Sequence, residues 1–145
     1  MEPIHAEPAS LVMPTPAEVY EQRFVPALFE PWSRVVVGAA QIEPNQQVLD
    51  VACGTGVLAR AAAERVGPLG KVSGLDPNAE MLAVARRKSR SIEWRDGRAE
   101  ALPWPGETFD AVRAMLPAGV HVVNTAVSVE HDDDEDVADS RDFLL

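Results

Sequence analysis

The sequence predicts an α/β protein in which helices flank a parallel sheet. Short apolar runs alternate with helical patterns, a turn containing two glycines follows the first run, and helix-start residues follow the second. The runs are "QVLDV", "KVSGLD", "SIEWRDG" and "TFDAVRAM". Because strands that alternate with helices pair in parallel through right-handed crossovers, these observations together favour this class.

Two helices are predicted before the first strand, within residues 15–43. Thr15, Pro16 and Glu18 have the order of a capping box with proline at the first helical position. Pro26 should interrupt or kink this helix, and a second helix should restart at Pro31. Its apolar face is predicted to contain Val35, Val36, Ala39 and Ile42.

The predicted core then covers residues 46–113. "QVLDV" suits a strand buried on both faces, and "GVLARAAAERVG" suits a helix that Gly67 closes. "PNAEMLAVARRKS" suits a second helix, with Asp76 as its potential N-cap. "GVHVVNTAVSVE" is β-prone and is predicted to add one strand to an exposed edge of the sheet.

Length and charge limit the function classes. The 145 residues suit one domain, with a mobile segment at 1–14, a folded part at 15–128 and an acidic, disordered tail at 129–145. From Arg113 onward there are two basic and eight acidic residues, which is −6 of the net charge of −10. This charge disfavours nucleic-acid binding. Asp132 to Asp136 could bind a cation, but no EF-hand spacing organises them, so no metal is predicted.

Neither a membrane span nor a secretory signal is expected from this sequence, so the predicted location is cytoplasmic, with no membrane partner. The single cysteine, Cys53, is interpreted as a small residue packed in a tight turn rather than as a reactive thiol.

The turn in "VLDVACGTGVLAR" lies where an open α/β sheet binds its ligand, beyond the carboxyl end of a strand. Gly54 and Gly56 permit tight turning and close approach of a ligand. A dinucleotide would use "GTGVLA" and Asp76, twenty residues after Gly56. However, Asp50 would repel a pyrophosphate, whereas S-adenosylmethionine carries an ammonium and a sulfonium. Asp50 therefore favours the sulfonium ligand.

With these motifs the sequence resembles the class I methyltransferases, in particular the small-molecule group similar to the ubiquinone and menaquinone biosynthesis methyltransferases. "VLDVACGTG", "GLDPNAEMLAVAR" and "GRAEALPWPGETFDAV" are similar to three motifs of that family, in the family's order. The resemblance covers roughly Tyr20 to Val112. It implies a Rossmann-like fold preceded by N-terminal helices, with S-adenosylmethionine as the cofactor.

The resemblance also implies residue roles. The backbone of Ala52, Gly54 and Gly56 would surround the methionyl part, with Asp50 at its ammonium, and Asp76 would accept both ribose hydroxyls. Pro77 and Met81 would pack on the face of the adenine, and Arg98 and Ala99 stand where the family meets its amino group and ring nitrogen. Tyr20 is a candidate cover of the cofactor. Arg98 stands where the family often has aspartate, so adenine recognition is expected through the backbone of Ala99 and stacking by Arg98, with Asp96 as a weaker substitute.

Structural interpretations of the same residues stay open. Asp50 could only cap a helix from the strand end, Asp76 could only be an N-cap, and Met81 could only be core. Trp94 and Trp104 are interpreted as packing residues. Tyr20 and Phe24 either close over the cofactor or form the apolar face of the first helix.

The predicted function is methyl transfer from S-adenosylmethionine to an unidentified small molecule. None of His5, His121 and His131 is a convincing base. After Val112 the chain departs from the family pattern, so the fold is expected to be incomplete. Either the chain is truncated or frame-shifted, or a homodimer completes the sheet through its exposed edge. The alternatives are a non-catalytic protein that binds S-adenosylmethionine or S-adenosylhomocysteine, or that supports a partner, and, third, an NAD-binding protein.

Overall fold

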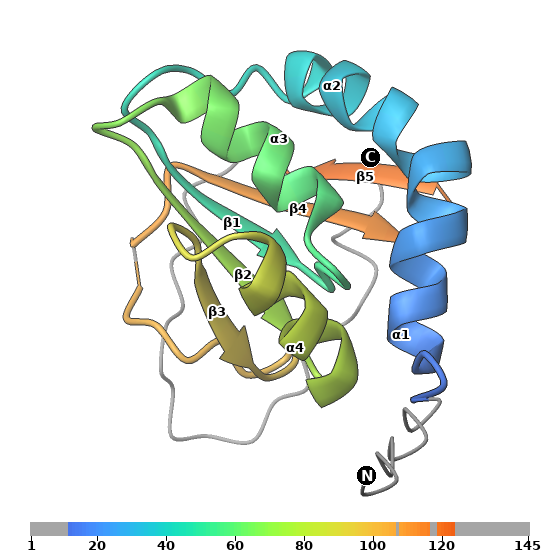
Figure 1. Ribbon diagram of the computed structural model, residues 1–145. Helices are drawn as coiled ribbons and strands as arrows, with labels where there is room; N and C mark the ends of the chain where they lie inside the picture. Colours follow the sequence, from blue (N-terminus) through green and yellow to red (C-terminus); the bar gives the residue numbers. More distant parts are fainter. Residues whose placement is uncertain (1–11, 107, 117–118, 124–145) are drawn as a thin grey trace, which may run out of the picture.

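The chain folds around one sheet, which a computed structural model describes for residues 12–106, 108–116 and 119–123. The strand order is β3-β2-β1-β4-β5. The strands are β1 (Gln47–Val51), β2 (Lys71–Asp76), β3 (Glu93–Asp96), β4 (Ala111–Leu116) and β5 (Gly119–Val123). The first four pair in parallel, as predicted, and β1 lies between β2 and β4, where the strand order reverses (Figure 1).

Two crossover helices join these strands. They are α3 (Val57–Val66), which follows β1, and α4 (Ala79–Lys88), which follows β2. Gly67 ends α3 with a φ of 71°, as predicted. β5 pairs antiparallel with β4, which confirms the expected extra strand over residues 119–123. Residues 1–11 of the predicted mobile segment at 1–14, and the acidic tail with His131, lie outside the described residues.

The central strands β1 and β2 are buried on both faces, as predicted for β1. On one face α2 and α3 pack against Val48, Val72 and Ala111. On the other face Leu49 and Leu75 pack together with side chains of the loop before β4 and of β4 itself, which are Trp104, Phe109 and Val112. Because neighbouring residues of a strand alternate between faces, Val48 and Leu49 belong to different halves of the core.

The N-terminal helices run on from one another without a break. The capping box at Thr15 is present, since its Oγ1 accepts from the Glu18 N–H at 3.2 Å and a Glu18 oxygen accepts from the Thr15 N–H at 2.8 Å. The segments are α1 (Pro16–Val19), the π-helix η1 (Tyr20–Phe29) and α2 (Glu30–Ala39) (Figure 1). Pro26 lies inside η1 and does not end it, so a complete interruption there is wrong, whereas the predicted restart is confirmed, since Pro31 lies in the first turn of α2. In an α-helix the Pro26 ring would meet the carbonyl four residues earlier, and the π register avoids that contact.

The predicted apolar face of α2 is half correct. Val36 and Ile42 are buried, but Val35 is 57% exposed and Ala39 is exposed as well. Val37 and Ala40 complete the buried face instead. The prediction extended the helical period to Ile42, whereas α2 ends at Ala39 and Gln41 turns the chain with a φ of 51°.

Candidate cofactor site

The turn between β1 and α3 is built on three left-handed residues. Ala52, Gly54 and Gly56 have φ values of 55°, 56° and 87°. The two glycines adopt this conformation without the steric cost that a Cβ brings. Ala52 adopts it at that cost. Cys53 is buried in this turn, which supports its interpretation as a packed residue, and burial raises the pKa of its thiol.

The indole ring of Trp94 packs directly against the glycine turn. A Cβ added to Gly56 would lie 2.3 Å from its indole ring, and one added to Gly74 on β2 would lie 2.4 Å from it. Gly74 and Trp94 are register partners on β2 and β3. The sequence interpretation of Trp94 as a packing residue is therefore correct but missed what it packs against. The pairing of a strand glycine with a tryptophan on the next strand was the signal that could have revealed it.

Asp76 ends β2 and ties the turn to that strand. One carboxylate oxygen accepts from the Gly54 N–H at 2.8 Å, and the other accepts from the Asn78 N–H at 2.8 Å. The N-cap of α4 is Asn78, which accepts from the Glu80 and Met81 N–H groups, so the prediction of Asp76 as the cap is wrong. Each oxygen of a carboxylate has two acceptor positions, so Asp76 keeps capacity for two further hydrogen bonds.

Asp50 lies at the end of the neighbouring strand β1 and is 2% exposed. The Ala59 N–H in the first turn of α3 donates to its carboxyl group, so the capping interpretation holds for one side of the group. Oδ2 is buried and has no hydrogen-bond partner among the described residues. Burial raises the pKa of Asp50, the hydrogen bond from Ala59 lowers it and the negative charge of Asp76 raises it, and together these effects place it at about 8. An unpaired buried carboxyl of this kind fits a cationic group.

Tyr20 comes to this site from the π-helix. Its ring lies 5.6 Å from that of Phe29 and 6.2 Å from that of Phe24. Phe29 follows Tyr20 by nine positions, which is two and a half turns of an α-helix at about 3.6 residues a turn, so a regular α-helix would place the two rings on opposite sides. Burial raises the pKa of Tyr20, and the negative charges of Glu21 and Asp76 raise it as well. Phe24 is 50% exposed and Tyr20 is half-buried, and a role for either ring over the cofactor stays a prediction.

The loop after β3 carries the predicted adenine residues. Arg98 and Ala99 are exposed, and the N–H of the preceding Gly97 donates to the backbone carbonyl of Asp76 at 3.3 Å. This bond brings the start of the loop beside the end of β2. On the other side of the site, Pro77 is exposed and Met81 is half-buried.

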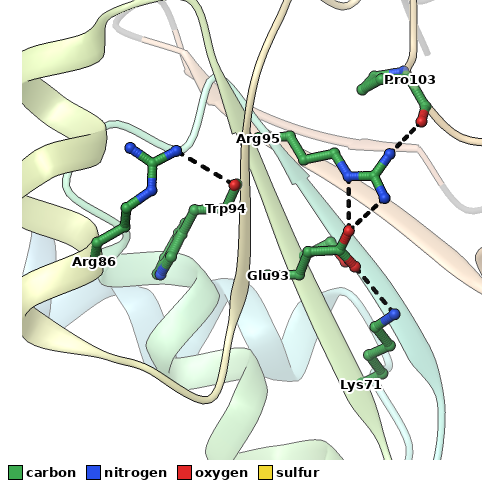
Figure 2. Close-up of polar contacts among 7 residues, drawn as sticks. Lys71, Arg86, Glu93, Trp94, Arg95 and Pro103 are labelled. Atoms are coloured by element: carbon green, nitrogen blue, oxygen red, sulfur yellow. Dashed lines mark hydrogen bonds and ion pairs between the residues drawn. The ribbon is translucent and has the colours of Figure 1, made fainter.

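A charged network fixes that loop on β3 (Figure 2). The Arg95 guanidinium bonds the Glu93 carboxylate and the Pro103 carbonyl and lies 4.6 Å from the centre of the Trp104 ring. Lys71 pairs with Glu93 at 3.0 Å, and its hydrogen bond, together with Arg95, lowers the pKa of Glu93. Trp104 is 8% exposed, which supports its interpretation as a packing residue.

The structure thus brings Asp50 and Asp76 to one edge of the sheet, beside the glycine turn. No described group of three or more His, Cys, Asp or Glu side chains is placed to hold a metal ion. None of the helices in the described part of the chain has the length and apolar character that crossing a membrane requires.

Comparisons with known proteins agree with this arrangement. The family model of the methyltransferase domain matches residues 48–129, which is more than half of the chain. The demethylmenaquinone methyltransferase of Symbiobacterium thermophilum is 41% identical over 90 residues, which cover 58% of this chain and 36% of that protein. The ubiquinone/menaquinone biosynthesis C-methyltransferase of Stenotrophomonas maltophilia is 41% identical over 87 residues, which cover 56% of this chain and 34% of that protein.

Solved structures give the same answer for the fold. A SAM-dependent methyltransferase from Aquifex aeolicus is 25% identical with a TM-score of 0.53, over 57% of this chain and 46% of that one. The predicted Rossmann-like α/β class is confirmed, as is the predicted family. This chain spans about a third of the length of the curated relatives that it matches. The chain belongs to the methyltransferase domain family.

Proposed function

We propose that the glycine turn binds S-adenosylmethionine and that the chain serves methyl transfer to a small-molecule acceptor. The observation that carries this proposal is the Asp50 carboxyl, which is 2% exposed and has one oxygen without a partner, beside a turn that Asp76 fixes. A buried carboxylate without a partner is costly, and a cationic ligand would remove that cost. The family match and the SAM-dependent neighbour support the same cofactor.

Electrostatics separates this ligand from a dinucleotide. A bound ammonium would favour the charged form of Asp50 and lower its raised pKa, so binding would release a proton. A pyrophosphate would instead be repelled by the negative charge of Asp76. The Asp50 carboxyl is neutral or negative, so it could not neutralise the pyrophosphate charge. NAD is therefore the weaker candidate ligand for this turn.

The residues take separate roles in the proposed complex. Asp76 would accept the ribose hydroxyls with the acceptor positions that its bonds to Gly54 and Asn78 leave open. Tyr20 would cover the cofactor from the N-terminal helix, while Pro77 and Met81 would lie along the adenine. Ala99 would meet the adenine through its backbone, and Arg98 would stack on it.

The cofactor would supply an electrophilic methyl group, whose bond to sulfur breaks as the bond to the acceptor forms. The chain's contribution is then to hold donor and acceptor in line, which is a large part of such catalysis. We assign no general base. The names of the matched relatives support a quinone-type acceptor, and this acceptor remains a proposal because the chain spans only about a third of those proteins.

Calorimetry with S-adenosylmethionine, S-adenosylhomocysteine and NAD tests the binding proposal. We expect both sulfur ligands to bind and Asp76→Ala to weaken their binding by about 1.5–3 kcal/mol, the range for hydrogen bonds to a charged group. Glu80→Ala is the matched control, because Glu80 is an exposed carboxylate in the first turn of α4. NAD binding without a response to the sulfur ligands would overturn the assignment.

A second candidate function is cofactor binding without turnover. The observations at the site concern the cofactor, and none of the described residues is assigned to an acceptor or as a general base. Transfer of a labelled methyl group across a panel of quinone acceptors separates the two functions. Product formation would exclude the binder, whereas binding with no product on any quinone would favour it.

A further inference from the structure

One guanidinium links the N-terminal helix to the middle of the glycine turn. Arg60 lies in the first turn of α3, and its Nη1 donates to the carbonyl oxygen of Thr55 at 2.7 Å. Its Nη2 donates to Oε1 of Glu21, on η1, at 3.0 Å. Thr55 stands between the two glycines, so the guanidinium binds the backbone in the middle of the glycine turn. Arg60 thereby connects this turn to Glu21, which lies 39 residues earlier in the chain.

The Glu21 end of this link is firmly held. The Glu21 side chain is 7% exposed, and besides Arg60 it pairs with Lys88 of α4 at 3.5 Å. A buried carboxylate is costly unless it is paired, so the two cations fix where η1 sits over the sheet. Because Tyr20 precedes Glu21 directly, the same contact also fixes the backbone from which the Tyr20 ring projects.

We infer that Arg60 is a positioning residue that couples the N-terminal helix to the glycine turn, so that each segment orders the other for cofactor binding. Arginine suits this role because its planar fork can bond two acceptors at fixed angles, which a lysine ammonium cannot reproduce. The part that concerns the cofactor rests on the proposed function. The coupling of the two segments does not.

A neighbouring ion pair provides a matched control. Glu18 on α1 pairs with Arg87 of α4 at 2.8 Å, so it also anchors the N-terminal helix to the core. Its Arg87 side chain is 60% exposed, compared with 25% for Arg60, and the pair makes no contact with the glycine turn. Loss of this pair should loosen the helix without reaching the turn.

Hydrogen exchange on the full chain without cofactor tests the coupling. In the wild type the N–H groups of Cys53, Gly54 and Gly56 are bonded to Leu75, Asp76 and Cys53 and report the order of the turn. We expect Arg60→Met to accelerate their exchange by about tenfold or more, Arg60→Lys to accelerate it as well, and Glu18→Gln to leave it unchanged. Wild-type exchange rates in Arg60→Met would overturn the inference, as would equal acceleration by Glu18→Gln.

Binding of S-adenosylmethionine tests the consequence for the site. We expect Arg60→Met to raise Kd about tenfold, a loss of 1.4 kcal/mol, and Glu21→Gln added to Arg60→Met to cause little further loss, because the two residues act as one unit. Additive losses would overturn the coupling. If Arg60→Met fails to fold, the affinities of Glu21→Gln alone and of the double variant are compared instead. Neither variant leaves an unpaired buried charge at position 21. A wild type that binds no S-adenosylmethionine would refute the proposed function, while the exchange data would still decide the coupling.

Discussion

Ala52 leaves β1 in a conformation that residues with a Cβ adopt at a cost. Its φ of 55° is left-handed, like those of the two glycines that follow in the turn. The left-handed region costs a residue with a Cβ about 1–2 kcal/mol. The turn therefore stores strain at its first residue, where the backbone is proposed to meet the methionyl part of the cofactor.

Ala52→Gly should raise the free energy of unfolding by about 0.5–1 kcal/mol. The relief of strain exceeds the loss from a more flexible unfolded chain, which is about 0.4–1 kcal/mol. Urea denaturation measures the change. Ala83→Gly is the control, since Ala83 is exposed within α4 and should lose about 1 kcal/mol instead. Destabilisation by both substitutions would argue against strain at Ala52.

The raised pKa of Asp50 predicts how stability depends on pH. Because the folded state binds the Asp50 proton more tightly than the unfolded state, the free energy of unfolding should fall as the pH rises toward about 8. The slope from one group is at most about 1.4 kcal/mol per pH unit. Asp50→Asn removes this group while it keeps an acceptor for the Ala59 N–H. Denaturation at pH 5, 6, 7 and 8 should therefore give a flatter profile for Asp50→Asn than for the wild type. Parallel profiles would contradict the shift.

Among the elements, β2 and β3 pack together where Gly74 on β2 lies against the indole ring of Trp94 on β3. Gly74→Ala should cost about 1–3 kcal/mol, because its Cβ would lie 2.4 Å from the Trp94 ring. Trp94→Leu removes that ring, so Gly74→Ala should cost less than half as much in this background. Denaturant midpoints of the single and double variants measure the coupling. Gly38→Ala, in α2 with open space around it, should instead gain about 0.5–1 kcal/mol. An equal cost of Gly74→Ala in both backgrounds would refute the contact.

The elements differ in how well the sequence predicts them. The strands and α3 follow from local patterns, because a buried run, a glycine turn and Gly67 each determine their own boundary. The buried face of α2 could not be predicted in the same way. The helical period does not continue to Ile42, because α2 ends at Ala39 and Gln41 turns the chain with a positive φ. The π register of η1 also escaped prediction. Pro26 signals a disturbance of the helix but does not say whether the chain kinks or widens there.

In the whole molecule, some contacts of the site could be predicted from the sequence and others could not. Asp50 and Asp76 end neighbouring parallel strands, so their meeting at one edge was predictable. The pairing of Glu21 with Arg60 was not, because no local pattern relates two segments that only tertiary packing brings together. Trp94 behind Gly56 depends in the same way on strand register, which the apolar pattern of these strands leaves open.

The proposed cofactor should stabilise the whole chain rather than the turn alone. Its site joins β1, β2, α3, α4 and η1, so global unfolding must release it. At one hundred times its Kd, S-adenosylmethionine should raise the free energy of unfolding by about 2.7 kcal/mol. Denaturant midpoints over a series of ligand concentrations measure this increase. NAD at the same concentrations serves as the comparison, and a midpoint independent of S-adenosylmethionine would contradict a site of this extent.

Because Trp94 packs against the glycine turn, its intrinsic fluorescence can report on this turn. Trp32 is 62% exposed and Trp104 is 8% exposed, whereas Trp94 is partly buried with its indole against Gly56 and Gly74. A chain in which phenylalanine replaces Trp32 and Trp104 would emit from Trp94 alone. Its fluorescence would then follow the closing of the glycine turn during folding, without any added label.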